Sequence, residues 1–85
     1  MKKITREEFI NLENGKCCFV RDEHKGGSRW LVEATTDNKY TASNLSGDYN
    51  DTNDRREGIR EDLIFYLLTE DEAIRYKGKI MVMMI

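Results

Sequence analysis

The sequence lacks the features that most often indicate a chemistry or a compartment. It has no proline, one histidine and one tryptophan, and its two cysteines are adjacent at 17–18. Adjacent cysteines make a poor disulfide framework, which favours a reducing compartment. No apolar run of signal-peptide length follows Lys2 and Lys3, and the apolar segment 80–85 is far shorter than the roughly 20 residues that span a bilayer. We therefore expect a cytoplasmic protein without membrane contact.

An excess of positive charge is missing as well. Lysine and arginine total 14 and aspartate and glutamate total 16, so the formal net charge is -2. Proteins that bind nucleic acid usually carry a basic excess, because neutralising phosphates releases counterions. The composition therefore argues against a nucleic-acid partner. The length fits one domain that covers residues 1–85.

Two capping boxes predict two short helices. The sequences TREE at 5–8 and TEDE at 69–72 each place a threonine three residues before a glutamate. In this arrangement the threonine side chain and the glutamate side chain each bond the other residue's backbone N–H. The first helix should end at 14–15, where asparagine and glycine tolerate a left-handed cap, and the second should run over 70–77 and end at Gly78.

Between the helices the pattern changes to strands. The runs 17–20 and 30–32 are short, apolar and rich in strand-forming residues. The polar, glycine-containing segment 21–29 separates them, which predicts an antiparallel hairpin. Asparagine and aspartate at 36–39 indicate a second turn, after which 40–42 should return as a third strand.

The second half of the chain is harder to assign. Residues 43–58 have no apolar periodicity and predict a long loop. The apolar run 63–68 fits either a buried strand or a helix that starts at Asn53, and its length and flanks favour the strand. Residues 80–85 should form the last strand. The resulting fold class is α+β: a small twisted, mostly antiparallel sheet of four or five strands, with an N-terminal helix and a short helix before the last strand.

Cys17, Cys18 and His24 are the first candidates for chemistry. Successive strand residues point to opposite faces, so the two thiols should not share a ligand sphere or a pocket. One should lie in the core and the other should face water or a neighbour, while His24 falls in the polar hairpin connection. The chain should therefore have no catalytic residue, metal or cofactor, and we expect that it is not an enzyme.

The acidic residues of 43–58 resemble a calcium loop only in composition. Reading an EF-hand loop from Asp51 puts Arg55 at the third ligand position. Reading it from Asp48 puts Thr52 there and asparagine where glycine is required. Neither reading fits, so a solvated loop is the better interpretation.

The segment HKGGSR at 24–29 is the best candidate for binding. Backbone N–H groups around two glycines can form an anion-binding concavity, and flanking basic side chains would add charge. Nearby aromatic side chains that reach the surface would make recognition anchors. The candidate binding residues are Lys25, Gly26, Gly27, Ser28, Arg29, Trp30, Tyr40 and Tyr49.

Two stretches, ITREEF at 4–9 and DLIFYLLTEDEA at 62–73, resemble parts of small uncharacterised proteins of tailed phages and prophages. In those proteins a similar capped helix leads into strands, and a similar apolar run precedes a short acidic helix. The resemblance covers about a fifth of the chain and carries over no functional residue. HKGGSRW at 24–30 and SGDYNDTNDRREG at 46–58 have no counterpart in it. It implies an accessory phage or mobile-element protein in the cytoplasm of a bacterial or phage-infected cell.

We therefore expect a non-enzymatic binding protein that docks on a host protein and modulates it, as an inhibitor would. The alternative is a module that binds phosphate or a nucleotide through the segment 24–29. A homodimer is a third expectation, since the apolar segment 80–85 could form an edge strand that pairs with a second copy.

Overall fold

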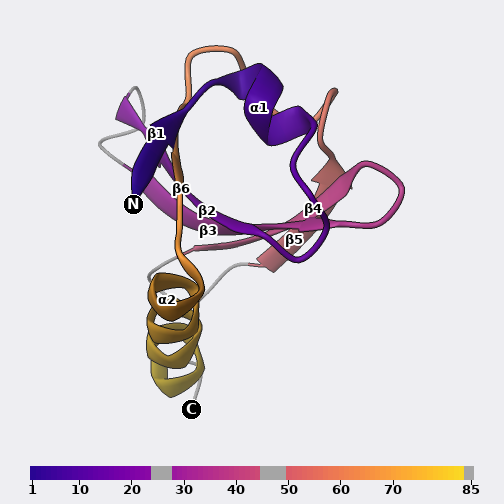
Figure 1. Ribbon diagram of the computed structural model, residues 1–85. Coiled ribbons are helices and arrows are strands. Elements are labelled where there is room, and N and C mark those ends of the chain that lie inside the picture. The colour runs from indigo at the N-terminus through magenta and orange to yellow at the C-terminus, as the bar shows by residue number, and fades with distance from the viewer. Residues whose placement is uncertain (24–27, 45–49, 84–85) are drawn as a thin grey trace.

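The computed structural model describes residues 1–23, 28–44 and 50–83. These residues form one antiparallel sheet of six strands and two helices, so the fold class is α+β as expected, with more strands than the four or five predicted (Figure 1). The strand order across the sheet is β1-β6-β2-β3-β4-β5. The elements are β1 (Lys2–Ile4), α1 (Arg6–Ile10), β2 (Cys17–Asp22), β3 (Ser28–Thr35), β4 (Lys39–Asn44), β5 (Asn50–Asp54), β6 (Ile64–Leu67) and α2 (Glu70–Met83).

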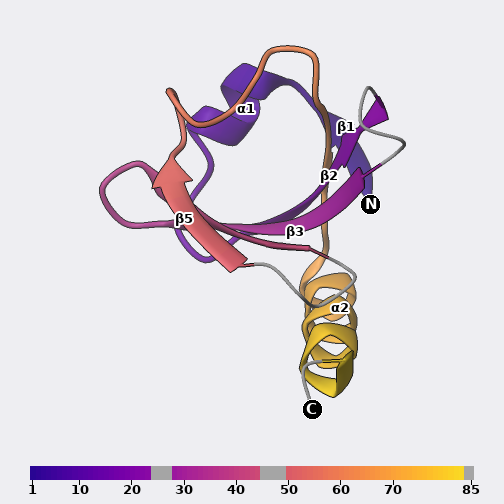
Figure 2. The same ribbon diagram turned by 180° about the vertical axis from the view of Figure 1, so that it is seen from behind.

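The sheet is strongly curved and does not close. Helix α1 covers its concave side, and α2 extends from the opposite side of the molecule, as Figure 1 and the reverse view in Figure 2 show. Strands β1 and β5 are the two edges. We call the side toward α1 the inner face and the side toward α2 the outer face.

The main core lies between the inner face and α1. Alternate residues of the central strands, such as Val20 and Val32, are buried there with Phe65 of β6. Phe9 of α1 is fully buried and stacks on Phe65, with ring centroids 5.0 Å apart. It meets the Tyr40 ring edge-on at 5.9 Å. Strand alternation thus supplies one apolar row, which the short helix covers.

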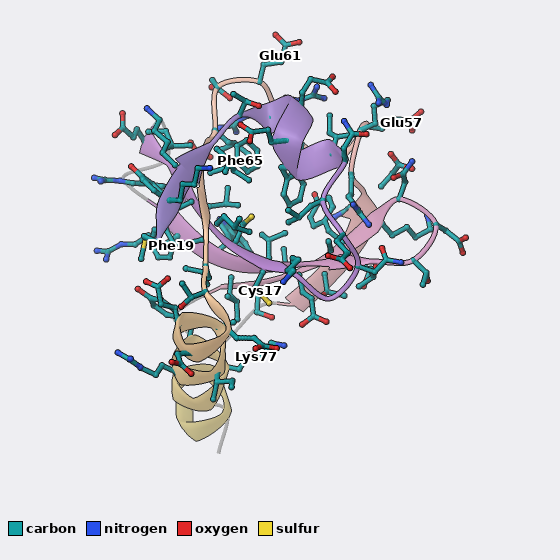
Figure 3. The ribbon with its side chains drawn as sticks, in the orientation of Figure 1. Cys17, Phe19, Glu57, Glu61, Phe65 and Lys77 are labelled. Carbon is teal, nitrogen blue, oxygen red and sulfur yellow. The ribbon has the colours of Figure 1, made fainter. Side chains whose placement is uncertain are left out.

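A smaller core lies between the outer face and α2. Cys17, Leu31 and Leu68 are buried there, and Ala73 and Tyr76 of the helix pack against them. Figure 3 shows Cys17 beside the helix and Phe65 on the side of α1. The sheet is therefore covered on both faces, each by one helix.

The predicted hairpin is confirmed. Strands β2 and β3 pair antiparallel with Val20 opposite Trp30 and Cys17 opposite Glu33. The second turn is also confirmed, since Asp37 and Asn38 have φ angles of 59° and 57°, a conformation that these residue types tolerate. The run 63–68 contains β6, an interior strand that pairs with the edge strand β1 on one side and with β2 on the other, so the strand interpretation is right and the helix alternative is wrong.

Helix α1 begins as predicted and ends earlier. The Thr5 hydroxyl accepts from the Glu8 N–H at 3.1 Å, and the Glu8 carboxylate accepts from the Thr5 N–H at 3.0 Å. The end was predicted at 14–15, but the cap is Asn11, whose side-chain amide donates to the Glu7 carbonyl at 3.0 Å. Gly15 adopts a φ of 88° in the turn that enters β2 instead. A competing side-chain bond therefore ends the helix before the glycine is reached.

Two strands were not foreseen. Strand β1 is short and two of its residues are lysines, and β5 lies within the segment 43–58 that was predicted to be a loop. Both are edge strands, and an edge strand needs neither apolar alternation nor an apolar run to pair. Strand β5 is defined by its backbone pairing with β4, in which Thr41 lies opposite Thr52, because the polar sequence of β5 alone gives no strand signal.

The end of α2 is the main correction. The helix was expected to end at Gly78 and to lead into a strand over 80–85, but it continues through Gly78 to Met83. Among the described glycines only Gly15 has the positive φ of a helix stop. A mid-helix glycine costs about 1 kcal/mol, which the surrounding helix tolerates. Residues 80–83 are helical, so they cannot form the edge strand on which the expected homodimer depended; residues 84 and 85 lie outside the described part.

Candidate binding pocket

A pocket of about 210 Å³ opens on the inner face of the sheet. Strands β2, β3 and β4 form one wall, and the segment 58–63 between β5 and β6 forms the other. The pocket is continuous with the main core, since several of its apolar residues are core residues. The apolar lining comprises Val20, Trp30, Val32, Ala42, Ile59 and Leu63.

Trp30 forms a wall of this pocket. It lies opposite Val20 in the β2–β3 pair, and register places both on the inner face. Its side chain is half-buried and packs against the main core. Of the predicted site residues that the structure describes, Trp30 and Tyr40 line the pocket, and Trp30 is partly exposed whereas Tyr40 is buried.

Tyr40 lines the pocket as a buried residue and not as the exposed anchor that was predicted. It was expected to reach the surface, but it is only 4% exposed. The hydroxyl donates to the Gly58 carbonyl at 3.0 Å, which is how a buried tyrosine satisfies its polar end. Tyr40 therefore positions the segment that forms the second wall.

An ion pair supplies the polar part of the pocket. Asp22 is 5% exposed, and Nη2 of Arg60 lies 2.8 Å from its Oδ2. Nε of Arg60 also donates to Asp62 Oδ1 at 3.0 Å. These hydrogen bonds, the one to Asp62 first and the one to Asp22 second, raise the pKa of Arg60 above its usual value. The guanidinium is thus held between two carboxylates, one nearly buried and one exposed.

The sequence interpretation missed this ion pair, although a signal for half of it was present. Cys18, Val20 and Asp22 stand at alternate positions of one strand, so they point to one face. The alternation places Asp22 on the core face, where a carboxylate needs a partner. Nothing in the sequence indicated that Arg60, 38 residues later by number, would be that partner.

Arg29 does not join the pocket. It lies directly opposite Arg21 in the β2–β3 pair and is exposed on the outer face, whereas its neighbour Trp30 faces inward. The backbone of Ser28 pairs with Asp22 at the start of β3. Within the predicted binding segment 24–29, the side chain that the structure describes is that of Arg29, and it lies on the face opposite the pocket. Lys25, Gly26, Gly27 and Tyr49, together with His24, lie outside the described residues.

The two cysteines lie on opposite faces, as strand alternation predicted. Cys18 is fully buried in the main core, and Cys17 is 2% exposed beneath α2 rather than open to water. The Cys17 thiol lies 3.7 Å from Oε1 of Glu33, which also pairs with Nζ of Lys77 at 2.6 Å. Burial raises the pKa of Cys17 and raises that of Cys18 to about 12. Both thiols are therefore neutral at physiological pH.

Within residues 1–23, 28–44 and 50–83, no cluster of histidine, cysteine or acidic side chains has the grouping of a metal site. In the same part of the chain, no helix combines the length and the apolar character required to cross a bilayer.

Comparison with protein-family models, with curated protein sequences and with solved structures finds no match to the chain.

Proposed function

We propose that the protein is a non-enzymatic binding module that docks on another protein, and that the pocket on the inner face receives one side chain of that partner. The volume carries this proposal. Sites for drug-sized ligands measure roughly 300–1,000 Å³, and this pocket measures about 210 Å³. It suits a single anchor side chain better than a nucleotide.

The construction of the pocket supports the same function. Three paired strands and the Tyr40–Gly58 hydrogen bond hold its walls, so little ordering is needed when a partner binds. Trp30, partly exposed and next to a nearly buried ion pair, belongs to the residue types that dominate interface hot spots.

The biological setting of this proposal rests on the resemblance to phage and prophage proteins. It is an accessory role in the cytoplasm of a bacterial or phage-infected cell, where docking on a host protein would modulate or inhibit it. The resemblance concerns residues 4–9 and 62–73, and Leu63 is the pocket residue that falls within them.

The test compares two variants of strand β4. Ala42→Leu fills the pocket from its inner-face position, whereas Ser43→Leu adds the same side chain one residue later on the opposite face. Each purified protein is used to capture partners from bacterial lysate, and the captured proteins are identified by mass spectrometry. We expect a partner that wild type and Ser43→Leu retain and that Ala42→Leu loses. Equal capture by Ala42→Leu and wild type would reject the pocket as the docking site.

A second function, anion binding, has one observation in its favour. Arg21 and Arg29 lie directly opposite each other on the outer face, and both are exposed. Like charges in this arrangement destabilise a sheet, and a bound phosphate would relieve that repulsion. None of the ion pairs described above involves either guanidinium.

Thermal unfolding in inorganic phosphate and in ATP tests this second function. A ligand that binds the native state raises the melting temperature by mass action. We expect a rise for wild type that is lost in Arg29→Ala and kept in Lys2→Ala, a lysine of the edge strand β1. A rise that survives in Arg29→Ala would count against the arginine pair as the site.

A further inference from the structure

We infer that the pocket on the inner face recognises a lysine side chain of the partner, whose ammonium group lies against Asp22 while its methylene stem fills the apolar part. This inference rests on the docking function proposed above and specifies the chemistry of the anchor. It follows from the charges, the shape and the aromatic wall of the pocket.

The charge inside the pocket favours a cation. Among the described residues that line it, Asp22 and Arg60 are the charged ones. The Asp22 side chain is 8% exposed and the Arg60 side chain is 46% exposed, so water screens the guanidinium far more than the carboxylate. Arg60 also shares its charge with Asp62 outside the pocket. The group formed by Arg60 and its two carboxylate partners, Asp22 and Asp62, therefore carries a net negative charge.

The shape favours a side chain with a long apolar stem. Four aliphatic side chains line the pocket, those of Val20, Val32, Ile59 and Leu63. Lysine buries four methylene groups along such a surface and keeps its charge at the polar end. Trp30 adds an aromatic side chain to this lining, and an ammonium placed over the face of its indole would be attracted.

Lysine fits better than the other charged side chains. An arginine would need a planar pair of acceptors, and the available carboxylate already bonds the guanidinium of Arg60. An ammonium is a compact point charge without that requirement. An acidic side chain would add a third carboxylate around Arg60, which already pairs with Asp22 and Asp62, and would be repelled by both.

The experiment uses the single tryptophan as the reporter. Trp30 lines the pocket and is the only tryptophan of the chain, so its fluorescence reports occupancy of the pocket. The full chain is titrated at pH 7.5 with n-pentylammonium, n-pentylguanidinium, n-pentanol and pentanoate at constant ionic strength. These probes share one apolar stem and differ in the end group. We expect saturable binding of n-pentylammonium, weaker binding of n-pentylguanidinium and n-pentanol, and none of pentanoate.

Substitutions in the Asp22–Arg60 ion pair should change n-pentylammonium binding in opposite directions. Asp22→Asn removes the carboxylate and should weaken n-pentylammonium binding by about tenfold, the usual effect of losing a hydrogen bond to a charged group. Arg60→Gln removes the guanidinium that pairs with Asp22 and should strengthen the same binding. Asp71→Asn makes the same chemical change on the exposed first turn of α2, away from the pocket, and should leave binding unchanged. Circular dichroism confirms that each variant is folded.

Several results would overturn the inference. They are equal binding of n-pentanol and n-pentylammonium, tighter binding of n-pentylguanidinium or pentanoate, weaker amine binding in Arg60→Gln, and the absence of any response to n-pentylammonium. None of these bears on the capture comparison of Ala42→Leu with Ser43→Leu, which alone decides whether the pocket is a docking site. If that comparison succeeds and the amine titration fails, the pocket binds a partner through another kind of side chain.

Discussion

Gly58 occupies a position where the backbone passes close to its neighbours. A Cβ atom added there would lie 2.8 Å from Asn53 Cβ and 2.9 Å from the Tyr40 hydroxyl, which are distances that real structures avoid. Gly78, in the middle of α2, is the opposite case, because nothing lies within 4 Å of an added Cβ. The two glycines therefore have different reasons to be glycine.

A pair of alanine substitutions distinguishes them. Gly58→Ala should lower the free energy of unfolding by about 1–3 kcal/mol, because the new methyl group overpacks the turn and displaces Tyr40. Gly78→Ala should raise it by roughly 0.5–1 kcal/mol, because alanine loses less backbone entropy in a helix. Urea unfolding followed by circular dichroism measures both. A destabilised Gly78→Ala protein would contradict the open surroundings of that residue.

The two thiols should not react in the folded protein. Cys17 and Cys18 are 2% and 0% exposed, and burial raises the pKa of each, so the reactive thiolate is scarce at pH 8. We expect Ellman's reagent to detect no thiol in native protein at pH 8 within minutes, and two thiols per chain in 8 M urea. Prompt labelling of one thiol without denaturant would show that α2 does not cover Cys17.

The same shifts predict a loss of stability in alkali. A raised folded pKa means that the native state holds its proton more tightly than the unfolded chain. The contribution is present below the ordinary thiol pKa of 9.0 and is lost as the pH rises from there toward the value of about 12 for Cys18. Urea midpoints at pH 8 and pH 10 measure it, and Cys18→Ala should reduce the difference between them. A difference that Cys18→Ala leaves unchanged would assign the effect to other groups.

At the scale of the elements, the two helix starts are the features that the sequence predicted most accurately. Both capping boxes are present, the second with Thr69 N–H donating to Glu72 at 2.9 Å and Glu72 N–H donating to the Thr69 hydroxyl at 3.2 Å. Capping depends on residues within one turn, so local sequence is sufficient to predict it. The helix ends depend on competing bonds and on continued packing, and both were predicted at the wrong residue.

The capping glutamates predict a loss of stability in acid. Hydrogen bonds from the Thr5 backbone and side chain lower the pKa of Glu8, and the Thr69 backbone bond followed by the Met1 ammonium lowers that of Glu72. A lowered folded pKa gives stability that is present above the ordinary value of 4.5 and is lost as the pH falls through the folded pKa. We expect the urea midpoint to drop between pH 5 and pH 3.

Glutamine variants identify the source of that drop. Glutamine still accepts the capping hydrogen bond but does not titrate, so Glu8→Gln and Glu72→Gln should each flatten the dependence on pH below 5. Glu57→Gln, at an exposed position outside the helices, serves as the control and should follow wild type. An acid drop that both capping variants retain in full would assign it to other carboxylates.

The strands show where local sequence is insufficient. The apolar runs at 17–20, 30–32 and 63–68 predicted β2, β3 and β6, because central strands bury both faces and need apolar residues. Strands β1 and β5 went unpredicted because an edge strand is defined by its neighbour and not by its own residues. Strand alternation puts Arg29 and Trp30 on opposite faces, but which of the two faces the core could be derived only once the register was known.

For the molecule as a whole, Arg55 joins parts that are distant in sequence. It is 3% exposed, and its guanidinium donates to the carbonyls of Lys39 at 2.9 Å and Thr35 at 2.6 Å and to the Asn14 side chain at 2.8 Å. It also donates to the carbonyl of Ile10 at the end of α1. One side chain thereby connects α1, the β3–β4 turn and the edge strand β5 across the open side of the sheet.

Replacing Arg55 should therefore destabilise the whole fold. Arg55→Met leaves several carbonyls without a donor and should lower the free energy of unfolding by roughly 3 kcal/mol or more. Arg56→Met is the matched control. Its side chain is 59% exposed and pairs with Glu7 at 3.7 Å, an arrangement that contributes about 0–1 kcal/mol. Equal effects of the two substitutions in urea unfolding would contradict the role given to Arg55.

The candidate site could be predicted only in part, because some of its residues come from segments that are distant in sequence. Trp30 was identified as an anchor from its residue type and its neighbours, and Asp22 could be placed on the inner face by alternation. Arg60, Ile59 and Leu63 reach the pocket because the segment after β5 crosses the sheet, and Arg55 and Tyr40 hold that segment by long-range hydrogen bonds. No local pattern encodes such a crossing.

The pocket shares much of its apolar wall with the main core, since Val20, Val32 and Ala42 belong to both. Binding of a partner side chain in the pocket should therefore raise the melting temperature. Substitutions of core residues beneath α1 should change the affinity without contacting the bound side chain. The affinity for a partner and the stability of the fold would then depend on the same few aliphatic side chains.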